Sequence, residues 1–437
     1  MAGEDLIKPQ NIAISLSAEP STDQQLYDEV VRGVKLNNFY NLMKHRLITN
    51  FDGATSYIIV ASFIAFLSYC WIFSAIQASI LCSCTAILVV LRRRLSSERI
   101  RDAFCIDHYE FEPPQSWRIS KDDVIKIMHN NPNCTKESRD FMSRLLEKAD
   151  IGDSTAWPPC VVKTLKTGKM WTHTMADARH EADVTLTTVF QGLLDKTGLK
   201  PHDIDMLVIT CSIFSPTPTL CAMLCNKFKL RSDIITYNIA GTGCSANGVG
   251  TDLAIRLLQT PKDSNCVVIA LECMTLGVYE GNERAFLVGN AIFRCGAAAV
   301  LLTNKQDKRA KYKLIEMVRH QDPGDAEYDC VYEDEDDNGC HGVRIDKTLA
   351  DIASKTMVQN FRRLVRYITP SVYIDKIIGI DGNAPNLKNL FQHFAIHTRG
   401  RKILDRVQSN LNLSDRDMLP SRLTLYHYGN TIASSIW

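Results

Sequence analysis

The stretch DIITYNIAGTGCSANGVGTDLAIRLL, residues Asp233–Leu258, carries the pattern around which the rest of the chain is organised. Its first part, Ile234–Ile239, is rich in branched and aromatic residues, which is typical of a buried strand in a parallel sheet. A turn with several glycines follows and contains Cys244, and residues 252–258 carry a helical pattern. Glycine lets the backbone turn sharply and lets neighbouring backbone approach closely. The sequence therefore predicts a strand, a tight turn that holds a cysteine, and a helix.

Cys244 lies where this helix is expected to begin. Unpaired N–H groups and the helix dipole favour a thiolate at such a position, as a nucleophile requires. The chain has 15 cysteines, and a free cysteine is most often a small buried apolar residue, so a structural role stays open. The glycine-framed turn favours a nucleophile at Cys244. In contrast, we expect Cys211, at the end of a strand at 204–210, to belong to the core.

The composition indicates a large core and excludes a nucleic-acid partner. Hydrophobic residues make up 45% of the 437 residues, and 50 basic residues nearly balance 49 acidic ones. A chain of this length has more than one structural unit, and a nucleic-acid-binding domain would show a basic excess. The cysteines do not form the dense framework of a small secreted domain, and no CxxC pair recurs with zinc spacing. We expect reduced thiols that face the cytosol or the membrane.

The N-terminal part of the chain carries a predicted membrane anchor. Residues 1–53 are polar and are expected to form a cytosolic tail without a signal peptide. Residues 54–91 contain no Asp, Glu, Lys or Arg, and their length suits two crossings of roughly 20 residues each. Basic residues flank both outer ends, which predicts that both ends face the cytosol. The alternative is an apolar hairpin buried inside a soluble domain.

Three regions follow the predicted hairpin. Residues 92–158 are mixed and charged, as expected of a linker and cap. From residue 159 helices alternate with short apolar strands, which predicts an α/β body with a buried sheet. We divide the body into an N-terminal half, 159–310, and a C-terminal half, 311–437. The expected helices lie at 121–128, 136–146, 176–197, 216–228 and 386–393, and the expected strands at 204–210, 265–271, 297–302 and 377–380.

Two residues of the C-terminal half could assist a cysteine nucleophile, which needs a partner that stabilises the thiolate or shuttles charge. His397 follows an apolar stretch and precedes Gly400, which is typical of a strand end whose side chain points into a site. Asn430 follows Gly429 in the motif YHYGNT. On these residues alone, a satisfied histidine at a strand end and an asparagine in a turn remain open alternatives.

The other histidines and the acidic residues are weaker candidates. His393 and His397 have the four-residue spacing of a helical zinc pair, but the glutamate of an HExxH motif and a third ligand are missing, so we expect no metal site. His320 and His427 are expected to have surface or structural roles; together with His393 they are retained as possible additional site residues. The acidic run within 322–342 is expected to be a solvated loop and not a calcium site.

Several motifs together resemble those of one enzyme family. They are NIAGTGCSANG around Cys244, CSIFSPTPTL from Cys211, GNERAFLVGNAIFRCGAAAVLLTN from Gly281, CVYEDEDDNGCHGV from Cys330, HFAIHTRGR from His393 and YGNTIASSIW from Tyr428. In this order they resemble the plant-type 3-ketoacyl-CoA synthases, membrane-bound condensing enzymes of very-long-chain fatty acid elongation in the thiolase-like superfamily. The resemblance covers the predicted hairpin and nearly all that follows. It implies a five-layered αβαβα body of two similar halves, with the active site between them.

The resemblance also implies an activity and a location. Cys244 would accept the acyl group of a long-chain acyl-CoA, with His397 as the catalytic histidine and Asn430 as its partner. Malonyl-CoA would lose CO2 and extend the chain by two carbons, giving a 3-ketoacyl-CoA without any metal or redox cofactor. The enzyme would sit in the endoplasmic reticulum membrane with its body in the cytosol. It would act as a homodimer or in an elongase complex with reductases and a dehydratase.

The chain departs from the family pattern at two places. Where the family reads HAGGR, this chain has Thr398 and Arg399, which puts a long cation beside His397. The chain ends at Trp437, whereas family members continue to a glycine-rich turn that supplies an oxyanion donor, so we expect that donor to be missing. These departures motivate an alternative, a catalytically weak membrane-anchored partner of active synthases. A polyketide-type synthase is a third hypothesis, which the predicted hairpin disfavours.

Overall fold

The structure, a computed structural model, describes most of the chain after residue 101. The described residues are 53–72, 82–88, 102–169, 173–261, 263–357, 359–361, 363–364 and 391–437. Helix α3 (Gly53–Ile72) covers the first predicted crossing and residues 82–88 are helical, whereas the bend of the hairpin lies outside the described residues. In the part of the chain that the structure describes, no helix has the length and apolarity needed to cross a membrane. The predicted pair of crossings is therefore not confirmed.

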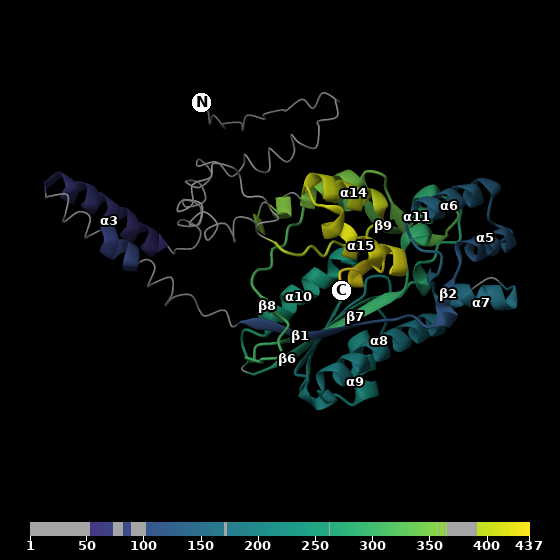
Figure 1. Cartoon of the computed structure of the whole chain (residues 1–437), viewed down its shortest axis with the longest axis horizontal. Coiled ribbons are helices and arrows are strands. Elements are labelled where there is room, and N and C mark those ends of the chain that lie inside the picture. Colours follow the sequence, from purple (N-terminus) through teal and green to yellow (C-terminus); the bar gives the residue numbers. More distant parts are fainter. Residues whose placement is uncertain are drawn as a thin grey trace, which may run out of the picture.

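The body is built on a mixed six-stranded sheet (Figure 1) with the strand order β5-β4-β6-β7-β1-β8. The strands β5, β4 and β6 run parallel, and the other three pair antiparallel with their neighbours. Strands β6 and β7 are buried along their whole length, as expected at the centre of a covered sheet. The sheet consists of β1 (Ala103–Glu110), β4 (Met206–Thr210), β5 (Ile235–Ile239), β6 (Asn265–Glu272), β7 (Gly296–Thr303) and β8 (Tyr312–Leu314).

Helices cover both faces of this sheet. Successive side chains of a strand point to opposite faces, so Val267 and Val268 of β6 belong to different hydrophobic clusters. Helix α8 (Met175–Thr197) packs with Val267 on one face, and α10 (Ala246–Leu257) packs with Val268 on the other. Gly250 lets α10 approach the sheet closely, because a Cβ there would lie 2.8 Å from Cγ2 of a threonine in β4.

The remaining elements lie in the cap, around the sheet and in the C-terminal region. Helices α5 and α6 start at side-chain caps, since Ser120 and Thr135 accept backbone N–H groups three residues on, which stabilises a helix start. These elements are η1 (Gln115–Trp117), β2 (Arg118–Ile119), α5 (Lys121–Asn130), α6 (Lys136–Lys148), β3 (Thr155–Ala156), α7 (Pro159–Thr167), η2 (Pro201–Asp203), α9 (Leu220–Phe228), η3 (Gly243–Ser245), η4 (Thr275–Gly277), α11 (Arg284–Ile292), α12 (Asp325–Asp329), β9 (Val331–Glu335), β10 (His341–Ile345), α14 (Arg401–Asn410), α15 (Asp415–Tyr428) and η6 (Ile432–Ser434).

The structure corrects three expectations about individual segments. The strand before the glycine turn is not buried, because β5 is the edge strand and Ile235 and Tyr237 are 45% and 43% exposed. Residues 103–110, which the sequence analysis places in the linker, form β1 within the sheet. The acidic run is not a simple loop, since it spans α12 and the β9–β10 hairpin and its Asp336 is buried.

The C-terminal half is described only in part. Residues 391–400 form neither helix nor strand, so His397 does not follow a strand and the end of the helix expected at 386–393 is not helical. The expected strand at 377–380 lies outside the described residues. Among the described residues this half includes β8, α12, the β9–β10 hairpin, α14, α15 and η6, without a second large sheet. The division into two similar halves stays a prediction.

Candidate active site

Cys244 lies in the turn that the sequence predicts. Gly241 and Gly243 have positive φ angles of 69° and 51°, a conformation that glycine adopts without strain. The short helix η3 then leads directly into α10, so the sulfur lies next to a helix N-terminus. The N–H of Gly243 donates a hydrogen bond to Ser212 Oγ at 2.8 Å, which ties the turn to the end of β4. The predicted order of strand, turn and helix is confirmed, and Cys244 is partly exposed.

The turn belongs to a cluster at the carboxyl edge of the parallel strands, where ligand sites of such sheets form. Cys211 and Ser212 follow β4, Cys244 follows β5, and Glu272 ends β6. The Glu272 carboxyl is fully buried and accepts the N–H groups of Ser212 and Ile213 at 2.9 and 2.7 Å. Cys211 is buried, as predicted. Glu272 was not among the residues predicted for the site. Its position as the single carboxylate at the end of the apolar strand NCVVIALE could have indicated it.

Asn430 is fully buried, and its amide is held in one orientation. Its Oδ1 accepts the N–H of Ile432 at 2.9 Å and the hydroxyl of Ser435 at 3.4 Å. Its backbone is fixed on both sides, since Asn430 donates to the carbonyl of Ile292 and accepts the N–H of Arg294. The Nδ2 atom is buried and has no hydrogen-bond partner among the described residues. Within the described part of the chain, this arrangement leaves the amide nitrogen of Asn430 available to a ligand.

His397 is connected to Asn430 through its neighbour in the chain. Thr398 is buried, and its hydroxyl donates a hydrogen bond at 3.1 Å to the carbonyl of Gly429, the residue before Asn430. Both ring nitrogens of His397 are buried and lack a partner within the described part of the chain. Burial and the charge of Arg399 lower the pKa of His397 to about 3, so the imidazole is neutral at physiological pH.

The segments that carry the three predicted residues meet in one region. The helix η3, which contains Cys244, contacts η6, which follows Asn430. The charge of Arg399 acts on both Cys244 and His397, since it lowers the pKa of each. The structure therefore gathers the turn with the cysteine, the segment with the histidine and the segment with the asparagine.

The electrostatics around Cys244 differ from the expectation of a stabilised thiolate. Burial raises the pKa of the Cys244 thiol, and the charge of Arg399 offsets only part of this effect. Burial also raises the pKa of Glu272 to about 8, and a negative charge on the Cys244 sulfur would contribute to that rise. Both groups are therefore mainly protonated at neutral pH, and the cysteine needs a base to become a nucleophile.

The additional histidines occupy different surroundings. His320 is partly buried with both ring nitrogens unpaired among the described residues. Its neighbour Arg319 forms an ion pair with Asp252 of α10 at 3.0 Å, which places it near the helix that follows Cys244. His393 and His427 are exposed. The described residues contain no cluster that could hold a metal ion, and the zinc-like pair of histidines falls in a segment without helix.

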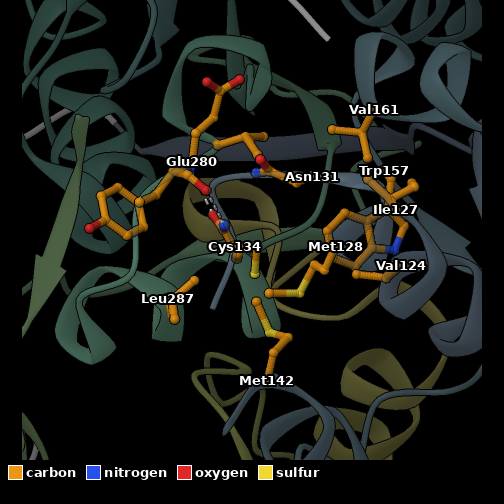
Figure 2. A pocket seen from close by; sticks show the side chains of 14 residues that line it. Val124, Ile127, Met128, Asn131, Cys134, Met142, Trp157, Val161, Glu280 and Leu287 are labelled. Carbon is orange, nitrogen blue, oxygen red and sulfur yellow. Dashed lines mark hydrogen bonds between the residues drawn. The ribbon is translucent and has the colours of Figure 1, made fainter. Parts of the chain in front are cut away.

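A small apolar cavity lies in the cap between α5, α6 and the loop that follows η4 (Figure 2). Figure 2 shows the sulfur atoms of Met128, Cys134 and Met142 gathered in it. Its volume of about 30 Å³ is enough for roughly one water molecule. None of the predicted catalytic residues lines this cavity, so it is not the chemical site.

A larger cleft of about 440 Å³ opens beside the residues that follow Asn430. Thr431, Ser434 and Ser435 form part of its wall, together with the ends of β1 and α15 and the start of β7. Trp437 also lines the cleft, and its ring N–H donates to an asparagine of α10 at 2.9 Å. Space for a ligand therefore adjoins the segment that holds Asn430.

The fold is of the thiolase-like class, and solved structures share it. The protein PKS-I from the brown alga Ectocarpus siliculosus has a similar structure with a TM-score of 0.63 and 17% identity over 77% of this chain and 87% of that one. The protein CsyB, solved as a mutant, is similar with a TM-score of 0.61 and 18% identity over 77% of this chain and 90% of that one. At this level of identity the likeness establishes the fold alone.

The sequence comparisons establish the family. Residues 95–376 match the family described as FAE1/Type III polyketide synthase-like protein. The chain belongs to this family, within the plant-type 3-ketoacyl-CoA synthases. It is 38% identical to 3-ketoacyl-CoA synthase 5 of Arabidopsis thaliana over 376 residues, covering 82% of this chain and 74% of the relative. It is 37% identical to 3-ketoacyl-CoA synthase 6 of Arabidopsis thaliana over 355 residues, covering 77% of this chain and 70% of the relative.

Proposed function

We propose that this protein is a 3-ketoacyl-CoA synthase that condenses a long-chain acyl-CoA with malonyl-CoA in very-long-chain fatty acid elongation. The observation that supports this most directly is a set of polar atoms in the region of Cys244 that have no hydrogen-bond partner among the described residues, namely both ring nitrogens of His397 and Nδ2 of Asn430. Buried polar groups are normally hydrogen-bonded, so these atoms are suited to bind a ligand. A thioester oxygen that becomes negatively charged during condensation is an acceptor of the required kind.

The first step of the proposed reaction is acyl transfer to Cys244. The imidazole of His397 accepts the proton of the thiol as the sulfur attacks the carbonyl carbon of acyl-CoA, and the negative charge that develops on the sulfur stabilises the imidazolium. A new carbon–sulfur bond forms, the bond to CoA breaks, and the CoA thiolate leaves with the proton. Cys244 then carries the acyl chain as a thioester.

The second step forms the carbon–carbon bond. Malonyl-CoA loses CO2, and the electron pair of the broken bond remains on the α-carbon as an enolate. His397 and Asn430 donate hydrogen bonds to the enolate oxygen, which lowers the barrier because the charge develops there. The α-carbon attacks the acyl thioester, releases Cys244 and gives a 3-ketoacyl-CoA two carbons longer. The proposed chemistry uses only the two substrates and groups of this chain, without a cofactor.

We also propose that the N-terminal apolar segments anchor the enzyme in the endoplasmic reticulum membrane with the body facing the cytosol. Support comes from α3, on which Tyr57, Ile58 and Phe63 are each more than half exposed. A surface of this kind is stable against lipid or another protein. An anchored enzyme would receive insoluble acyl chains directly from the bilayer.

The proposed partners are a second copy of the chain or the reductases and dehydratase of an elongase complex. Strand β5 supports the homodimer, because it is a sheet edge on which Ile235 and Tyr237 are exposed. An edge strand presents unpaired N–H and C=O groups that can pair with another chain. The partner would cover this apolar edge.

Elongation assays test the proposed function. Microsomes that contain the wild type are supplied with labelled malonyl-CoA and acyl-CoAs of increasing length, and the labelled products are identified. We expect a product two carbons longer from the wild type, none from Cys244→Ala, and an unchanged yield from the matched control Cys225→Ala. Equal products from the wild type and Cys244→Ala, or no product from either, would contradict the proposal. A silent wild type that raises the output of a co-expressed active synthase would favour the alternative role as a partner.

A further inference from the structure

Arg294 is a buried cation in the segment that contacts Asn430. The residue is 1% exposed, and burial lowers its pKa to about 9, so the side chain keeps its positive charge at neutral pH. Its Nε donates to the Thr155 hydroxyl at 2.7 Å, and its guanidinium lies over the Trp157 ring, 4.1 Å from the centroid. None of the described groups that it contacts is a carboxylate. A charge without a counter-ion is unfavourable to bury, so the contacts of this arginine indicate which groups it stabilises.

The guanidinium caps the C-terminal end of α11. The last C=O groups of a helix have no partner within the helix. Arg294 Nη1 donates to the carbonyl of Ala291 at 3.1 Å and to that of Phe293, just beyond the helix, at 2.7 Å. A cation at this end of a helix also interacts favourably with the helix dipole. The side chain of Arg294 therefore stabilises the end of α11 and joins it to Thr155 and Trp157 of the cap.

The next carbonyl of α11 is held by Asn430 itself. Ile292 accepts the backbone N–H of Asn430 at 3.1 Å, and the N–H of Arg294 donates to the carbonyl of Asn430 at 2.9 Å. These bonds form a parallel bridge between Phe293 and Asn430. Gly429 packs on the stem of Arg294, since a Cβ at Gly429 would lie 2.5 Å from Arg294 Cγ. The place of Asn430 is thus fixed by the helix end that the guanidinium caps.

We propose that Arg294 is a positioning residue that sets the Asn430 amide for the condensation step. The inference rests on the proposed function, in which Asn430 Nδ2 donates a hydrogen bond to the enolate oxygen. The hydrogen bonds to Oδ1 fix the direction of the amide within its own segment, and Arg294 fixes that segment relative to α11 and the cap. None of the described contacts of Arg294 involves Cys244 or His397, so its effect on the reaction passes through Asn430.

The two steps of the proposed reaction should respond differently to the loss of this side chain. Acyl transfer to Cys244 uses His397 as the base and does not use the Asn430 amide, whereas the enolate is stabilised by both. A displaced amide therefore slows condensation and leaves acyl transfer unchanged. A displacement of about 1 Å is enough to lower a rate by up to about 100-fold. A general loss of folded protein would lower both steps in the same proportion.

Hydrogen exchange tests the positioning without any need for activity. The full-length wild type and Arg294→Met, which keeps an unbranched side chain without the charge, are placed in D2O, and the peptide that contains Asn430 is followed by mass spectrometry. We expect this peptide to exchange about tenfold faster in Arg294→Met, the effect of one lost hydrogen bond from a charged group. The matched control Arg309→Met removes an arginine that donates to the carbonyl of Thr197 at the end of α8, at 3.1 Å, and should leave the exchange unchanged. Equal exchange in Arg294→Met and the wild type would overturn the inference.

Single-turnover kinetics test the consequence for the reaction. Acylation is measured as labelled acyl group on the Cys244 peptide in the absence of malonyl-CoA, and condensation as the product formed when malonyl-CoA is added to the acylated protein. Arg294→Met is expected to lower the condensation rate by about tenfold and to leave the acylation rate unchanged, whereas Arg309→Met should leave both unchanged. Equal losses in the two steps of Arg294→Met would show a structural role only.

A double-mutant cycle shows whether Arg294 acts through Asn430. Asn430→Ala is expected to lower the condensation rate by roughly 100-fold, and adding Arg294→Met should lower it no further, because the positioned amide is already gone. A further loss in the double variant would contradict the inference. If Arg294→Met does not fold, Thr155→Val, which removes one acceptor of the guanidinium, replaces it in every comparison with the same expected directions. A wild type that forms neither acyl-Cys244 nor product would contradict the proposed function, and hydrogen exchange would still decide the positioning.

Discussion

Glu272 should make the folded protein less stable as the pH rises through neutrality. Burial raises its pKa from the ordinary 4.5 to about 8, so the folded chain keeps a proton that the unfolded chain releases. The stability from this proton is fully present below the unfolded pKa and is lost as the pH rises towards the folded pKa. Each pKa unit corresponds to about 1.4 kcal/mol, so between pH 6 and pH 8 the free energy of unfolding should fall by roughly 2 kcal/mol.

Glu272→Gln isolates this effect. The glutamine oxygen can still accept the N–H groups of Ser212 and Ile213, because both donate to the same carboxyl oxygen, Oε1, at 2.9 and 2.7 Å. Urea unfolding followed by tryptophan fluorescence at pH 6, 7 and 8 measures the free energy of unfolding. The free energy of unfolding of Glu272→Gln minus that of the wild type should rise by roughly 2 kcal/mol over this range, whereas the same difference for the exposed control Glu316→Gln should show no trend. A constant gap would refute the reasoning, since Glu272 would then be ionised throughout.

The other predictions concern the segments around the histidine and the asparagine. Gly429→Ala should lower the free energy of unfolding by roughly 2 kcal/mol and reduce elongation, because φ is 73° and a Cβ would lie 2.5 Å from Cγ of Arg294; an unchanged melting temperature would contradict this. Thr398→Val removes the hydroxyl that donates to Gly429 and should cost about 1 kcal/mol in urea unfolding, with equal midpoints counting against it. Since the pKa of His397 is about 3, an NMR titration from pH 5 to pH 9 should show no imidazole transition, and Arg399→Gln should raise the pKa; a transition near pH 6.5 in the wild type would disprove this.

Local patterns in the sequence were sufficient to predict the elements around the nucleophile. The glycines around Cys244 and the apolar run before them predicted β5, the turn and α10, because turn conformation and helix periodicity depend on neighbouring residues. The burial of β5 could not be predicted in the same way. Whether a strand is central or at an edge depends on which other strands pair with it. Strand β1, which lies between β7 and β8 in the other half of the sheet, comes from a charged segment. Its Asp107 and Glu110 hid its strand character.

The protonation state of the groups in the site also could not be predicted from the sequence. A cysteine at a helix N-terminus suggested a thiolate, but burial raises the pKa of Cys244 by an amount that only the packed structure reveals. The orientation of the Asn430 amide depends on hydrogen bonds from the Ser435 hydroxyl and the Ile432 N–H. The sequence motif does not predict these hydrogen bonds. Membership of the family could be predicted from the order of the motifs. In contrast, coordinates were required to show that the His397 ring nitrogens and Asn430 Nδ2 have no partner among the described residues.

The distance between α10 and the sheet depends on Gly250, which has no side chain. Gly250 lies more than one helical turn beyond Cys244, yet its contact with β4 fixes how far the start of that helix, and with it the sulfur, stands from the strands. A side chain at this position would lift the helix as a rigid rod and shift the sulfur relative to groups on other segments. The position of the Cys244 sulfur thus depends on Gly250, a residue outside the predicted catalytic set. Variants at Gly250 should therefore be tested for turnover as well as for folding.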